Sequence, residues 1–105
     1  MSSDNSQCVV AVIWLFNPKI EKLREVLISV IGQVGKIVLV DNGSSNIKQI
    51  RDLRGSLESK DKIILLELRF NSGVYALNFG MSYVCKMFNP EFILLLDQDT
   101  IIYRT

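Results

Sequence analysis

Short apolar runs alternate regularly with segments of helical period along this sequence. Residues 8–16, 36–40, 63–68 and 92–96 have the length and the residue types of strands. Helical spacing of apolar residues follows each of the first three runs. Consecutive strands that are joined by helices need crossover connections, which is typical of parallel sheets. The pattern βαβαβαβ over 105 residues therefore predicts one α/β domain, a Rossmann-like open parallel sheet with helices on both faces.

Helix ends and inward faces follow from the same spacing. Asn17 and Pro18 suit the N-cap and the first position of the first helix. The second helix follows the polar turn 41–45, and its expected apolar face is Ile47, Ile50 and Leu57. We expect five residues of the third helix, which spans 73–88, to face inward: Val74, Leu77, Val84, Cys85 and Phe88.

Composition excludes several classes of function. The chain has no histidine, which excludes Ser-His-Asp and Cys-His nucleophiles and histidine zinc sites. Its formal net charge of +1 supplies no broad field for holding nucleic acid, so no nucleic-acid partner is expected. Any acid, base or metal chemistry must then come from carboxylates.

The two cysteines and the N-terminal residues indicate the compartment of the protein. Cys8 and Cys85 are far apart among apolar residues, which favours two buried free thiols in a reducing compartment over a disulfide. The longest apolar run, 8–16, is too short to span a bilayer, and the acidic, polar residues 1–7 do not resemble a leader. We therefore expect a cytoplasmic protein that begins with a disordered polar tail over residues 1–7.

Polar residues stand directly after each predicted strand. In open parallel sheets, ligands bind outside the carboxyl ends of the strands, so these residues should converge. The pair Asp97 and Asp99 could share a hard divalent cation with a diphosphate. Asp41 could accept a hydrogen bond from a base or a ribose, and Gly73 could lie against a phosphate. Taken singly, each also has a structural explanation as a surface acid, a turn residue or a helix cap.

The four segments together resemble a known family. Phe-Asn-Pro at 16–18, Val-Leu-Val-Asp-Asn-Gly-Ser-Ser at 38–45, Asn-Ser-Gly at 71–73 with Ala-Leu-Asn-Phe-Gly at 76–80, and Leu-Leu-Leu-Asp-Gln-Asp at 94–99 occur in order. This arrangement resembles the nucleotide-sugar-binding half of family 2 glycosyltransferases, and is most similar to the rhamnosyltransferases. The resemblance covers residues 8–102.

The resemblance implies a GT-A fold and a nucleoside-diphosphate sugar as donor, with dTDP-rhamnose favoured and Mg²⁺ or Mn²⁺ as cofactor. It implies transfer to a polysaccharide or lipid-linked acceptor, with a full-length enzyme acting in the cytoplasm or at the inner face of the membrane. By motif, Phe16 and Asn17 would line the nucleotide pocket and Asp41 would hold the base. Asn71 and Gly73 would lie near the ribose and the diphosphate. Asp97 would contact the ribose and the metal, and Asp99 would bind the metal.

In that family an acceptor hydroxyl attacks the anomeric carbon while metal-bound diphosphate leaves. Residues 8–105 match only the donor half, so we expect the general base beyond Thr105 and no turnover by this chain alone. The chain also has Leu15 and Phe16 where the family usually carries Thr-Tyr, and the segment 73–76 is one residue shorter than the family motif. A sheet edge left uncovered by a missing half predicts self-association. The alternative is a non-catalytic nucleotide-binding or interaction module derived from the family.

Overall fold

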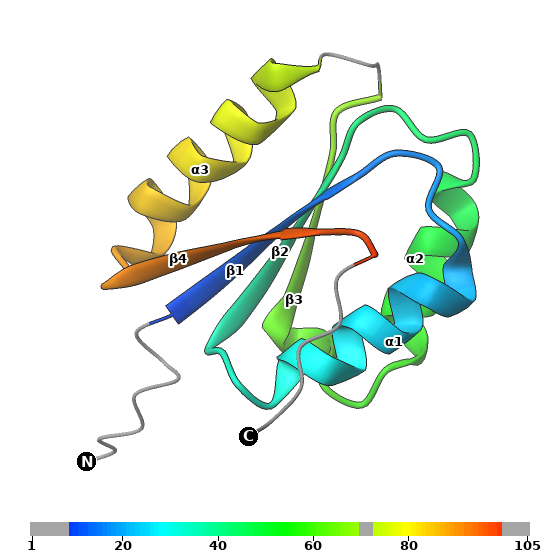
Figure 1. The fold of residues 1–105 in the computed structure, drawn as a ribbon, viewed down its shortest axis with the longest axis horizontal. Coiled ribbons are helices and arrows are strands. Elements are labelled where there is room, and N and C mark those ends of the chain that lie inside the picture. Colours follow the sequence, from blue (N-terminus) through cyan, green and yellow to red (C-terminus); the bar gives the residue numbers. More distant parts are fainter. Residues whose placement is uncertain (1–8, 70–72, 100–105) are drawn as a thin grey trace.

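The structure is a computed structural model that describes residues 9–69 and 73–99 (Figure 1). The predicted tail, Cys8 and Asn71 lie outside the described residues. The elements are β1 (Val9–Leu15), α1 (Ile20–Ile31), β2 (Lys36–Asp41), α2 (Ile47–Ser56), the 3-10 turn η2 (Lys60–Lys62), β3 (Ile63–Glu67), α3 (Val74–Phe88) and β4 (Phe92–Asp97). The predicted alternation of strands and helices is confirmed.

The described strands form one parallel sheet in the order β3-β2-β1-β4. From β1 the chain steps outward to β2 and β3, and then returns to place β4 on the other side of β1. The direction of winding therefore reverses between β1 and β4. In open parallel sheets, such a reversal opens a crevice at the carboxyl ends of the two strands, and this crevice is the usual place for a ligand.

Both faces of the sheet are covered, as predicted, and Figure 1 shows α3 on one side and α1 with α2 on the other. Alternate residues of β1, β2 and β3 enter two separate clusters. Ile37 and Leu39 of β2 belong to the cluster that contains residues of α1 and α2. Val38 and Val40 belong to the cluster that contains residues of α3. This is the period-two alternation of a strand buried on both faces.

Helix α3 approaches β2 very closely at Gly80. A Cβ placed on Gly80 would lie 2.5 Å from Cγ2 of Val40 and 3.4 Å from Cγ1 of Val12. The helix can pack at this distance only because glycine has no side chain there.

The predicted start of α1 is wrong. Helix α1 begins at Ile20 with Lys19 as its N-cap, so Asn17 and Pro18 precede it. Asn17 has a φ of 46°, in the left-handed region, whereas an N-cap residue has an extended backbone. Its side-chain oxygen accepts hydrogen bonds from Ser45 and not from the first turn of α1.

The predicted inward faces of the other helices need correction too. Cys85 is exposed. Among the residues of α3 whose burial the structure describes, the buried ones are Ala76, Gly80 and Val84, one helical turn apart, and Cys85 is turned about 100° from Val84. In α2, Ile50 is buried as expected. Leu53, which the prediction left out, is buried as well.

Strand β4 is an edge of the described sheet and exposes apolar side chains. Phe92 is 64% exposed and Leu95 is 49% exposed. The predicted self-association would use this edge, and it stays a prediction. Among residues 9–69 and 73–99, no helix has both the length and the apolar character needed to cross a bilayer.

Candidate functional site

Asp41 ends β2 and lies almost completely inside the protein, with 1% of its surface exposed. The strand register places it between Leu15 of β1 and Glu67 of β3, at the carboxyl edge of the sheet. The backbone N–H of Ser44 donates to Oδ2 of Asp41 at 3.0 Å, so the turn after β2 folds back onto the carboxylate. This contact confirms the turn chemistry of the sequence Asp-Asn-Gly-Ser.

The other carboxylate oxygen of Asp41, Oδ1, is also buried but accepts no hydrogen bond from any residue that the structure describes. Buried polar atoms are nearly always paired, and leaving one unpaired costs about 1–3 kcal/mol. Asp41 lines a hollow of about 280 Å³ whose other lining residues are Gly43, Ser44, Ile47, Arg51, Glu67 and Arg69. Asp41 therefore combines a place in the lining of this hollow with a carboxylate oxygen that has no partner among the described residues.

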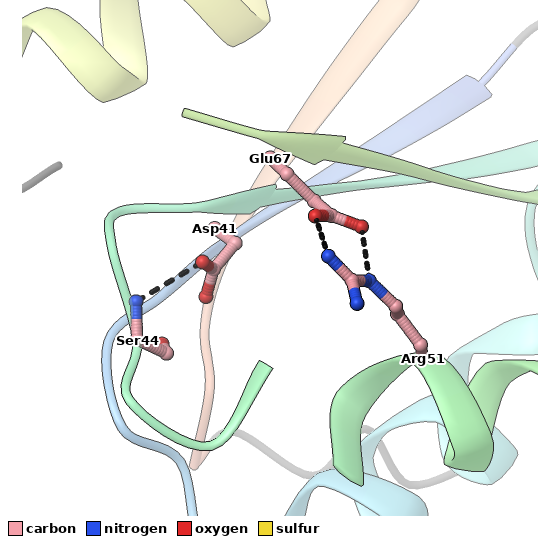
Figure 2. A network of polar contacts seen from close by, with 4 residues as sticks. All are labelled: Asp41, Ser44, Arg51 and Glu67. Carbon is pink, nitrogen blue, oxygen red and sulfur yellow. Dashed lines mark hydrogen bonds and ion pairs between the residues drawn. The ribbon is translucent and has the colours of Figure 1, made fainter. Parts of the chain in front are cut away.

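An ion pair between α2 and β3 also lines this hollow. Figure 2 shows the Arg51 guanidinium facing the carboxylate of Glu67, with Asp41 and Ser44 to one side. Nε of Arg51 donates to Oε2 of Glu67 at 2.8 Å, and Nη2 donates to Oε1. The hydrogen bond from Arg51 lowers the pKa of Glu67, and the same bond raises the pKa of Arg51. The two groups therefore form one bidentate unit in the lining of the hollow.

The end of β1 is tied to both neighbouring strand ends. The backbone N–H of Phe16 donates to Oε1 of Gln98 at 2.9 Å, and Nε2 of Gln98 donates to the carbonyl of Phe16 at 3.2 Å. The backbone N–H of Asn17 donates to Oγ of Ser44 at 2.8 Å. Because the side-chain oxygen of Asn17 is occupied by Ser45, both predicted residues here hold the edge of the sheet together.

A second hollow lies on the α3 side of the sheet, where β1 and β4 end. Its volume is about 540 Å³ and its lining residues are Trp14, Gly73, Leu77, Leu95, Leu96 and Asp97. Asp97 is paired with Trp14 in the strand register. Gly73 precedes α3 with a φ of 60°, a conformation that favours glycine. The predicted residues Gly73 and Asp97 are thus brought to one hollow, at the reversal of the sheet.

Asp97 and Asp99, which the sequence predicts as ligands of a divalent cation, are both exposed. Among residues 9–69 and 73–99, no group of three or more potential metal ligands is found together. Mg²⁺ in phosphate-handling sites is commonly held by one or two carboxylates, with substrate phosphates and water completing its shell. Asp97, which lines the second hollow, and Asp99, two residues further along the chain, are hard carboxylate donors of the kind that such a cation takes.

The structure therefore places five of the predicted residues around the two hollows and after the end of β1. Asp41 lines the first hollow, Gly73 and Asp97 line the second, and Phe16 and Asn17 follow β1. The Arg51–Glu67 pair was not predicted. The one available signal was Glu67, a charged residue inside the apolar run Ile-Ile-Leu-Leu-Glu-Leu.

The chain was compared with models of known protein families and with curated proteins. Neither comparison found a match.

Proposed function

We propose that this chain is the donor-binding part of a glycosyltransferase and that it binds a nucleoside-diphosphate sugar, with dTDP-rhamnose as the favoured donor and Mg²⁺ or Mn²⁺ as cofactor. The observation that carries the proposal is Asp41, a buried residue that lines a hollow at the carboxyl edge of the sheet and whose Oδ1 lacks a partner among the described residues. A base N–H donated to this oxygen would satisfy it.

The spacing of the strands suits a ligand that reaches from one hollow toward the other. Asp41 ends β2 and Asp97 ends β4, with β1 between them. Neighbouring strands lie about 4.8 Å apart, so two spacings separate these ends by roughly 10 Å. The base would lie at Asp41, and the diphosphate would lie toward Asp97 at the reversal of the sheet, where ligands of open parallel sheets bind.

When bound, the cation would neutralise charge on the departing diphosphate. Asp97 and Asp99 would hold it through carboxylate oxygens, and Gly73 would let the backbone approach a phosphate without a side chain in between. Gln98 would keep the ends of β1 and β4 in register through its two bonds to Phe16. The proposal concerns donor binding, since no residue is assigned here as the base that would activate an acceptor hydroxyl.

Thermal unfolding with dTDP, UDP and dTDP-rhamnose, each with and without Mn²⁺, tests the proposal. A ligand at a hundred times its dissociation constant stabilises a protein by about 2.7 kcal/mol. For a domain of this size the increase in Tm is roughly 10–20 °C. We expect Asp99→Ala to abolish the metal-dependent part of the shift and Asp41→Asn to reduce the shift with every nucleotide tested.

Asp52→Asn is the matched control, because Asp52 is an exposed acid of α2 that lines neither hollow. It should leave every ligand shift unchanged. A folded sample whose Tm does not move with any of the nucleotides would refute the proposal and favour the alternative, a non-catalytic interaction module. A shift that survives both Asp41→Asn and Asp99→Ala would place nucleotide binding elsewhere on the chain.

A further inference from the structure

The side chain of Gln98 continues the pairing of β1 with β4 beyond the ends of both strands. The register of the two strands ends at the pair Trp14 and Asp97. Past this pair, the backbone N–H of Phe16 donates to Oε1 of Gln98 at 2.9 Å, and Nε2 of Gln98 donates to the carbonyl of Phe16 at 3.2 Å. A side-chain amide offers both a donor and an acceptor, as a peptide group does. Gln98 therefore ties the chain after β4 to the chain after β1.

This tie holds a turn that carries exposed carboxylates on either side of Gln98. Gln98 and Asp99 form a turn directly after β4. Gln98 is half-buried, whereas Asp97 and Asp99 are exposed. Within residues 9–69 and 73–99, neither carboxylate takes part in a hydrogen bond or an ion pair. The side-chain contact that fixes this segment therefore comes from the residue between the two acids.

Two carboxylates bind one cation best when the backbone between them is already fixed. A loose turn loses conformational entropy when a cation draws both side chains together. For the backbone of one residue, this cost is equivalent to roughly 5- to 30-fold in affinity. Residues that orient metal ligands without touching the metal have effects of similar size. A turn that is already bonded to the sheet avoids much of this cost.

We propose that Gln98 is a positioning residue, which holds Asp97 and Asp99 in place for a divalent cation by fixing the turn against the end of β1. Gln98 acts through its two bonds to Phe16 and contacts neither the cation nor the nucleotide. This role rests on the proposed function, in which a cation and a diphosphate bind at the end of β4.

Isothermal titration of the whole chain with dTDP, once in Mn²⁺ and once in EDTA, tests this role. The ratio of the two affinities measures how much the cation strengthens nucleotide binding. Gln98→Met keeps the length of the side chain and removes both bonds to Phe16. Gln33→Met is the matched control, because Gln33 is also half-buried and its Nε2 also donates to a backbone carbonyl, that of Ser29. Gln33 lies three residues before β2 begins, at the other end of the parallel strands.

We expect Mn²⁺ to raise the affinity of the wild-type chain for dTDP. Gln98→Met should reduce this increase by roughly 5- to 30-fold and leave the affinity in EDTA unchanged. Gln33→Met should keep the wild-type ratio. A merely structural role for Gln98 would lower the affinity in both buffers by the same factor, and the resulting unchanged ratio would overturn the inference.

Hydrogen exchange in the wild-type chain gives a second test that needs no variant. Binding effects are reciprocal, so a cation whose site is held by the tie strengthens the tie in return. With dTDP present, Mg²⁺ should slow exchange of the Phe16 amide more than exchange of the Gly35 amide, which bonds the carbonyl of Val9 at the start of β1. Equal slowing of both amides would overturn the inference, and this test decides alone if Gln98→Met does not fold.

The outcomes separate this role from the proposed function. If Mn²⁺ strengthens dTDP binding equally in the wild type and in Gln98→Met, the inference falls and the proposed function stands. If Mn²⁺ does not strengthen dTDP binding by the wild type, the inference falls together with the proposed cation, while nucleotide binding stands. If the wild-type chain binds no dTDP in either buffer, the inference and the proposed function both fall.

Discussion

The contact between Gly80 and Val40 makes a sharp prediction about how α3 packs on the sheet. In Gly80→Ala the new Cβ would meet Cγ2 of Val40 at 2.5 Å, far inside normal contact distance. Val40 is fully buried and β-branched, so it has little freedom to turn away. Overpacking of this kind costs about 1–3 kcal/mol. Alanine in a helix interior contributes about 1 kcal/mol relative to glycine, which offsets part of that cost.

Gly55→Ala is the matched control. Gly55 lies in α2, and a Cβ placed on it would meet no atom within 4 Å. The control should stabilise the protein by up to about 1 kcal/mol, through helix propensity alone. The free energy of unfolding of the two variants should therefore differ by about 1–3 kcal/mol. Urea denaturation measures this difference directly, and the corresponding difference in Tm is on the order of 5–20 °C.

A double-mutant cycle with Val40→Ala identifies the contact itself. Removing Cγ2 of Val40 makes room for the new methyl group, so Gly80→Ala should destabilise the Val40→Ala background less than it destabilises the wild type. The reasoning is refuted if Gly80→Ala stabilises as much as Gly55→Ala does. Additive effects in the cycle would refute it as well, because they would show that the two residues do not touch.

Three further predictions concern single side chains. Gln98→Ala removes both bonds to Phe16 and should lower the free energy of unfolding by about 1–2 kcal/mol in urea; an unchanged midpoint would contradict this. Arg51 lowers the pKa of Glu67, so the ion pair stabilises the fold above pH 4.5, the ordinary pKa of this carboxyl group, and the stabilisation is lost as the pH falls through the lowered pKa. The Tm should therefore fall less between pH 7 and pH 3 in Glu67→Gln than in the wild type. An equal fall in both proteins would show that the ion pair does not stabilise the fold. Exposed Cys85 should react with a thiol reagent without denaturant, and Cys85→Ser should remove that rapid reaction.

Element type and strand boundaries were predictable because they depend on local geometry. A strand places successive side chains on opposite faces and a helix repeats every 3.6 residues, so apolar spacing distinguishes them without knowledge of the fold. The first strand was predicted over 8–16 and is observed at Val9–Leu15. The position of Asp41 at a strand end followed in the same way, since a polar turn comes directly after the apolar run.

Whether an individual side chain is buried, and which partner it bonds, was less predictable. Cys85 lies one residue from the buried Val84, and a rotation of about 100° per residue decides between core and solvent. Asn17 has good capping chemistry, but the turn after β2 brings Ser45 within 2.8 Å of its side-chain oxygen. A partner 28 residues away thus replaces the local one.

The alternation of four strands with helices, and the polar residues that end the strands, can be read from the sequence, because periodicity is set by neighbouring residues along the chain. The strand order β3-β2-β1-β4, and with it the reversal beside Asp97, is known from the folded protein alone. The same holds for the contact of Arg51 with Glu67 and for the burial of Oδ1 of Asp41 without a partner among the described residues. Strand order and side-chain pairing depend on the free energy of contacts between segments far apart in sequence, which local spacing does not encode.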